Sequence, residues 1–131
     1  MITIFGWMEI RATYLDEDLY NIDENKIYQE VEKLVSDLRH NKLAFEQKNY
    51  TRYIQFNVFE NHKTERTEEI ISLFEKISKV ANGSYGLLYC LDDEDKEYSD
   101  EFRVLVSKKG IVEWNKDEFF SPCSSMIEDL D

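Results

Sequence analysis

The side chain best suited to acid–base chemistry is His62, which lies in the segment Asn61-His62-Lys63. A general base needs a nucleophile or an acid that the fold brings close to it. Cys123 could form a thiol–base pair with His40 or His62, but nothing in the spacing requires it. The sequence contains no Gly-x-Ser-x-Gly, His-Glu-x-x-His or glycine-rich phosphate loop. We therefore expect no enzyme activity and interpret His62 as a loop residue bonded to backbone or to a partner.

A second candidate is the acidic run at residues 92–101 (DDEDKEYSDE), with seven acids and one lysine. Carboxylates can ligate a hard cation, but this run lacks the alternating ligands and central glycine of an EF-hand loop. We expect no metal and no cofactor. The run is then either a solvated loop or a patch that pairs with Lys and Arg of another protein. Tyr85 and Tyr89 precede it, and tyrosine is enriched in interface hot spots.

Charge limits the partners that this chain can have. Its 131 residues include 28 acids and 16 bases, a net charge of −12. Residues 92–101 contribute −6 and residues 117–131 contribute −5, so the remaining 106 residues carry only −1. Nucleic-acid phosphates and anionic membranes would be repelled, whereas a basic protein would be attracted.

Localisation follows from what the sequence lacks. There is no apolar run of about 18 residues that could span a membrane. The opening MITIFGWMEIR has no basic start of the kind that a secretion signal needs. The two cysteines, Cys90 and Cys123, form no disulfide framework or zinc motif. We expect a cytoplasmic protein with reduced thiols.

Hydrophobic periodicity predicts the elements that position these residues. Alternating apolar residues indicate strands, and three- and four-residue spacing indicates helices. No linker divides the chain, so residues 1–131 are expected to form a single domain. It is expected to be α+β, with a mainly antiparallel sheet of about five strands and two helices on one face. The predicted order is strand 2–11, helix 23–40, strand 50–59, helix 65–80, strand 85–91 and strands 102–106 and 111–114.

Capping residues mark the ends of the two predicted helices. Asn21 or Asp23 suits the start of the first helix, and Asn41 its end. Thr64 suits the start of the second helix, and Asn82-Gly83 would end it in a left-handed conformation. In the last hairpin, the turn Ser107–Gly110 places glycine where a positive φ is expected.

The two tryptophans, Trp7 and Trp114, are expected to be partly buried. An exposed tryptophan would instead indicate a binding anchor. Phe5 and Trp7 share the face of strand 2–11 that lies opposite its isoleucines, which indicates that this second face is also partly covered.

Several motifs in order along the chain resemble the immunity protein 7 family of bacterial polymorphic toxin systems, which include contact-dependent growth inhibition. The most specific are Gly83–Tyr89 (GSYGLLY) running into Asp92–Asp95, and the tail Ser121-Pro122-Cys123. The others are Gly6-Trp7, Asn61-His62-Lys63, Glu101-Phe102-Arg103-Val104, Gly110, Phe119-Phe120 and Ile127-Glu128-Asp129. Two positions depart from the family pattern: Lys63 replaces an arginine, losing its planar fork, and Asn82 replaces a proline.

The resemblance implies an immunity protein without enzymatic activity that binds and neutralises a cognate C-terminal toxin domain. Together with the charge, it suggests a basic, nucleic-acid-targeting toxin blocked sterically by an acidic, tyrosine-bearing surface. The expected contact residues are Tyr85, Tyr89, Asp92, Asp93, Glu94, Asp95, Glu97, Asp100, Glu101, Asn61, His62, Glu128 and Asp129. One alternative is an acidic nucleic-acid mimic, with carboxylates spaced regularly over one face. The other is a small enzyme that uses His62.

Overall fold

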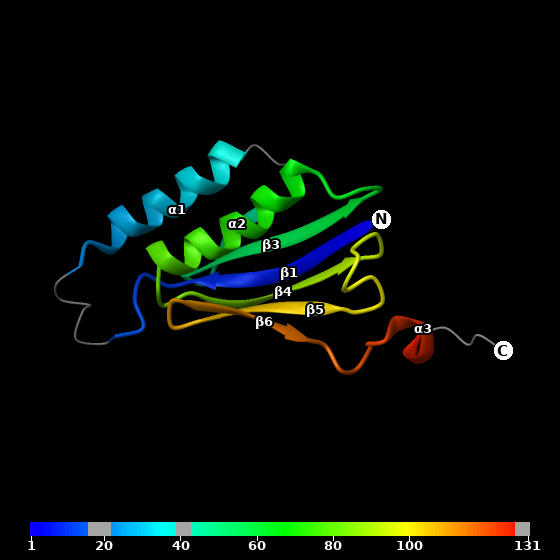
Figure 1. The fold of residues 1–131 in the computed structure, drawn as a ribbon. Helices are drawn as coiled ribbons and strands as arrows, with labels where there is room; N and C mark the ends of the chain where they lie inside the picture. Colours follow the sequence, from blue (N-terminus) through cyan, green and yellow to red (C-terminus); the bar gives the residue numbers. More distant parts are fainter. Residues whose placement is uncertain (16–21, 39–42, 128–131) are drawn as a thin grey trace.

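Two helices lie on one face of an antiparallel six-stranded sheet (Figure 1). This computed structural model describes residues 1–15, 22–38 and 43–127. The strand order is β2-β3-β1-β4-β5-β6, so the first strand of the chain lies inside the sheet. The elements are β1 (Ile2–Ile10), α1 (Glu24–Leu38), β2 (Leu43–Lys48), β3 (Thr51–Glu60), α2 (Glu65–Val80), β4 (Tyr85–Asp92), β5 (Arg103–Lys108), β6 (Ile111–Lys116) and α3 (Cys123–Met126). The predicted α+β class is confirmed, and the sheet has six strands rather than about five.

The additional strand is β2, which forms a hairpin with β3. Its only larger apolar residues are Leu43 and Phe45, and it is partly exposed at the sheet edge. The two-residue turn is Asn49-Tyr50, with φ of 51° and 66°. Positive φ at both positions suits a hairpin turn, but a tyrosine there is unusual, so the sequence did not mark the turn.

The core lies between the helices and one face of the sheet. The predicted apolar face of β1 is buried there, including Ile4 and Met8 with no exposed surface. The α2 stripe packs against it, and Phe74 meets Phe56 of β3 edge to face at 5.7 Å between ring centroids. Helix α1 contributes the buried Val31. Both helices therefore turn apolar residues toward the core, as their three- and four-residue spacing predicted.

The predicted starts of both helices are confirmed. Asp23 Oδ1 accepts the Lys26 amide hydrogen at 3.2 Å. Thr64 is the N-cap of α2, and its amide donates to Thr67 Oγ1 at 2.9 Å. Asn21 and Asn41, two further proposed capping residues, lie outside the described residues.

The predicted left-handed stop after α2 is wrong. The helix ends at Ala81 with φ −116°, and neither Asn82 nor Gly83 has a positive φ. Gly83 is required for a different reason: a Cβ there would lie 2.4 Å from the Thr13 carbonyl oxygen. By contrast, Gly110 has φ 74°, as predicted for the β5–β6 turn.

Antiparallel pairing gives the sheet two chemically different ends. Ile2 of β1 pairs with Asp92 of β4, so the acidic run 92–101 leaves the sheet beside the N-terminus (Figure 1). Glu9 pairs with Tyr85 at the opposite end, close to the β5–β6 turn. Among the helices of the described segments, none is long and apolar enough to cross a membrane.

Candidate functional site

Exposed aromatic rings line the sheet face opposite the long helices. Phe5 and Trp7 of β1 are 42% and 40% exposed there. Phe5 stacks on Tyr89 at 5.2 Å between centroids, and Trp7 meets Tyr85 edge to face at 5.8 Å. We call these four residues the aromatic face. Tryptophan and tyrosine are enriched in protein interfaces, so an exposed row of such rings marks a candidate binding surface.

The two tryptophans have different environments. Trp114 packs against the core, as expected. Trp7 differs from the expectation: it is 40% exposed on the open face, where it can serve as an anchor. The expectation that this face is partly covered holds at one end, where tail residues Phe119 and Phe120 line a cavity together with Phe5.

A buried carboxylate fixes one end of the aromatic face. Glu9 is only 6% exposed and accepts a hydrogen bond from Arg11 Nε at 2.9 Å. A hydrogen bond to Glu9 raises the pKa of Tyr85, so its hydroxyl stays protonated. The Arg11 guanidinium lies 5.4 Å from the centre of the Tyr85 ring. Tyr85 is therefore held in place before any partner arrives.

The acidic run 92–101, which we call the acidic loop, is organised by its own carboxylates. Asp95 accepts the amide hydrogens of Glu97 and Tyr98 at 2.8 and 2.9 Å. These backbone hydrogen bonds lower the pKa of Asp95. Asp92 accepts the Glu94 amide at 3.1 Å. Asp92 and Asp95 thus shape the loop.

Neighbouring segments also contact the acidic loop. His62 Nδ1 lies 2.7 Å from Glu94 Oε1, so the structure brings the Asn61-His62 segment and the loop together. The N-terminal amine is 2.8 Å from Asp93, and this hydrogen bond raises the pKa of the amine. Glu101 lies 3.8 Å from Lys116.

The Ser-Pro-Cys tail holds the far end of the acidic loop. Asp100 accepts hydrogen bonds from the amide and the hydroxyl of Ser124 at 2.9 and 2.5 Å. Its own carbonyl accepts the Cys123 amide at 2.9 Å. Ser121 Oγ in turn accepts the Phe102 amide at 2.9 Å. The tail motif is therefore a structural clamp on the loop.

The predicted contact residues do not form one compact patch. Tyr85 and Asp92 are at opposite ends of β4, about 24 Å apart for eight extended residues. Tyr89 lies between them, and Asp100 is occupied by the tail. The tail acids Glu128 and Asp129 lie outside the described residues.

The tail adds an apolar cavity of about 480 Å³ to the open face, beside the acidic loop. Phe119 and Phe120 line it and are 81% and 52% exposed. These two residues, Phe5 and Trp7 were absent from the predicted contact list. The signal was present, since Phe5 and Trp7 occupy alternate positions of a predicted strand and the two tail phenylalanines precede the Ser-Pro-Cys motif.

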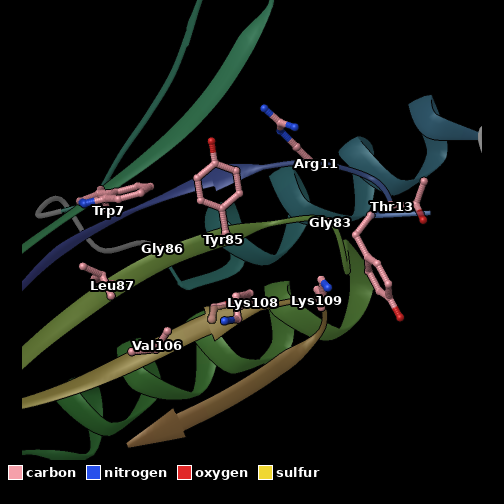
Figure 2. A pocket seen from close by; sticks show the side chains of 12 residues that line it. Trp7, Arg11, Thr13, Gly83, Tyr85, Gly86, Leu87, Val106, Lys108 and Lys109 are labelled. Atoms are coloured by element: carbon pink, nitrogen blue, oxygen red, sulfur yellow. The ribbon is translucent and has the colours of Figure 1, made fainter. Parts of the chain in front are cut away.

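A second cleft, of about 470 Å³, lies at the other end of the same face (Figure 2). Trp7 and Tyr85 form part of its wall. Its charged lining residues are all cationic: Arg11 directly after β1, Lys108 at the end of β5, and Lys109 in the β5–β6 turn. We call it the basic cleft.

Of the three residues considered for catalysis, the structure describes His62 and Cys123. Cys123 is partly exposed, and its amide donates a hydrogen bond to the Asp100 carbonyl at 2.9 Å. The other cysteine, Cys90, was not a catalytic candidate; burial raises the pKa of its thiol to about 11, which disfavours the reactive thiolate. His62 is 72% exposed and has Glu94 as its partner. His40 lies outside the described residues. Within the part of the chain that the structure describes, no three His, Cys, Asp or Glu side chains are grouped to hold a metal ion.

A sheet with one open face, exposed aromatic rings and charged segments at both ends is typical of a protein that acts by binding another protein. The profile of the family described as immunity protein 7 matches residues 1–129, and the chain belongs to this family. Family membership indicates an immunity protein directed against a toxin. Comparisons with curated proteins and with solved structures gave no match.

Proposed function

We propose that this chain binds a basic, nucleic-acid-targeting toxin domain and blocks it sterically, using the acidic loop and the adjoining aromatic face. The observation that carries the proposal is the position of the acidic loop. It continues directly from β4, the strand that supplies Tyr89 to the aromatic face. One partner can therefore contact carboxylates and aromatic rings together.

The acidic loop offers its charge in a fixed arrangement. Because Asp95 and Asp92 hold the loop backbone, the more exposed acids Asp93 and Glu97 lie at the surface, Asp93 beside the N-terminal amine. Carboxylates held before binding attract a basic domain and select its orientation. The bound chain then covers part of the toxin surface, so that substrate cannot reach the toxin.

The aromatic face supplies contact area that charge alone does not give. Aromatic rings buried at the centre of an interface carry much of the binding energy. The stacked and edge-to-face pairs keep these rings ordered in the free protein, so little side-chain freedom is lost on binding. We place this encounter in the cytoplasm, within a contact-dependent inhibition or related toxin system.

The nucleic-acid mimic receives less support. Its carboxylates would be spaced regularly over one face, in place of phosphates. The open-face positions of the described strands carry only three acids, Glu9, Glu46 and Glu113, and Glu9 is buried. Seven of the 22 acids among the described residues lie instead in the acidic loop.

The proposal is tested by purifying the toxin domain encoded beside this gene and measuring its complex with the chain. We expect a stable complex, loss of toxin activity, and association that slows as salt rises. Asp93→Lys/Glu97→Lys should weaken binding. The matched control, Glu30→Lys/Glu32→Lys, makes the same charge change on exposed positions of α1. Equal effects of both pairs, or an unaffected Asp93→Lys/Glu97→Lys variant, would exclude the acidic loop as the contact.

A further inference from the structure

The basic cleft is unexpected in a chain with a net charge of −12. Its three cations come from two places in the sequence, Arg11 and the pair Lys108-Lys109. Arg11 is already paired with Glu9 at 2.9 Å. Across residues 1–15, 22–38 and 43–127, neither Lys108 nor Lys109 has a carboxylate within 4.0 Å. The cleft therefore has two positive charges that the described chain does not neutralise.

The walls of the cleft suit an acidic side chain of a protein. Figure 2 shows Trp7, Tyr85 and Arg11 on the β1–β4 side and both lysines on the side of the turn. The cleft opens directly onto the aromatic face, because Trp7 and Tyr85 belong to both. A partner lying on that face would reach the cleft without leaving the sheet surface.

The distance between the two charged ends matches the size of one interface. The cleft lies at the Tyr85 end of β4 and the acidic loop at the Asp92 end, about 24 Å apart along the strand. A standard interface buries about 800 Å² on each partner, which corresponds to a patch about 30 Å across. A single toxin domain seated on the aromatic face would therefore touch both ends.

We propose that the basic cleft binds an Asp or Glu side chain of the toxin while the acidic loop binds its basic surface, so that the toxin docks in one orientation. This inference rests on the proposed function and adds a second contact of opposite charge. Opposite charges at the two ends of a face discriminate against the reversed orientation, which would bring like charges together.

The charge reversal Lys108→Glu/Lys109→Glu gives a test in which the sign of the effect is decisive. It changes the net charge by −4, from −12 to −16. If net charge alone governed binding, a basic toxin would bind this variant faster and more tightly. If the cleft holds a toxin carboxylate, the variant should instead raise the Kd about tenfold or more. The matched control Lys26→Glu/Lys33→Glu adds the same charge on exposed α1 positions and should not weaken binding.

The contact can also be located directly in the wild-type complex. A water-soluble carbodiimide joins a lysine amine and a carboxylate as an amide, and the reagent takes up the water that is lost. Mass spectrometry should find Lys108 or Lys109 joined to an Asp or Glu of the toxin. The double variant could bind weakly because it folds poorly. The single variant Lys108→Gln is therefore tested as well, and its urea midpoint is measured to show that it is folded.

The outcomes separate this inference from the proposed function. If the wild-type chain fails to bind the toxin, the proposed function fails and the inference fails with it. If wild type binds but Lys108→Glu/Lys109→Glu binds equally or more tightly, or no cross-link forms at the cleft, only the inference is overturned. A weakened variant, an unaffected control and a mapped cross-link together would establish the two-charge docking surface.

Discussion

Removing the Asp100 carboxylate should release the tail from the acidic loop. The carboxylate accepts two hydrogen bonds from Ser124, at 2.9 and 2.5 Å, in a partly buried position. A hydrogen bond to a charged group contributes about 1.5–3 kcal/mol, and partial exposure reduces each. We therefore expect Asp100→Ala to cost about 2 kcal/mol of local stability, or about a 30-fold shift toward the open tail.

Amide hydrogen exchange measures this opening directly. The Ser124 amide loses its acceptor in the variant, and the Met126 and Ile127 amides report whether the α3 turn persists. We expect all three amides to exchange about 30-fold faster in Asp100→Ala. The same variant should weaken toxin binding, because the clamp positions Phe119 and Phe120 beside the open face.

Asp93→Ala is the control, since it removes the same charge from the acidic loop without touching the tail. Tail exchange should be unchanged in this variant. Asp100→Asn keeps a neutral acceptor, so its tail amides should exchange at rates between those of wild type and Asp100→Ala. Unchanged tail exchange in Asp100→Ala, or equal acceleration in Asp93→Ala, would refute the clamp.

Three further predictions concern stability and reactivity. The pKa of Asp95 is lowered from its ordinary 3.8 by amide hydrogen bonds, so its contribution to stability is present above pH 3.8 and is lost as pH falls through the lower folded value. The urea midpoint of Asp95→Asn should accordingly lie below that of wild type at pH 6 and converge with it in acid. Tyr50 is 96% exposed with φ 66°, so Tyr50→Gly should raise the free energy of unfolding by about 0.5–1 kcal/mol in a urea titration. Since the pKa of Cys90 is about 11, about one thiol in a thousand is ionised at pH 8, and iodoacetamide should leave Cys90 unmodified until the protein unfolds.

Each of these predictions has a result that contradicts it. If the difference in urea midpoint between wild type and Asp95→Asn stayed constant down to pH 2, the carboxylate charge would not be what the loop amides require. A destabilised Tyr50→Gly would show that the exposed ring makes contacts that outweigh its backbone strain. Rapid alkylation of Cys90 in the native protein would contradict its burial.

Most of the secondary structure and the core-facing residues could be predicted from the residue pattern. Alternation predicted β1 and β3, and the three- and four-residue spacing predicted α2 at its observed bounds, Glu65–Val80. These patterns predict the elements because each element buries one face, so apolar residues recur along the sequence with the period of that element. Strand β2 was missed because it has few apolar residues and its turn uses Tyr50 where glycine is usual.

The assembly of the candidate site, by contrast, depends on contacts between residues that are far apart in the chain. The acidic run is visible in the sequence, but its clamp joins Asp100 to Ser124, 24 residues further on. The basic cleft brings together Trp7, Arg11 and Lys108 through the pairing of β1 with β4 and of β4 with β5. Strand register depends on all the backbone hydrogen bonds and packed faces of the sheet at once, so no local pattern encodes which distant side chains become neighbours.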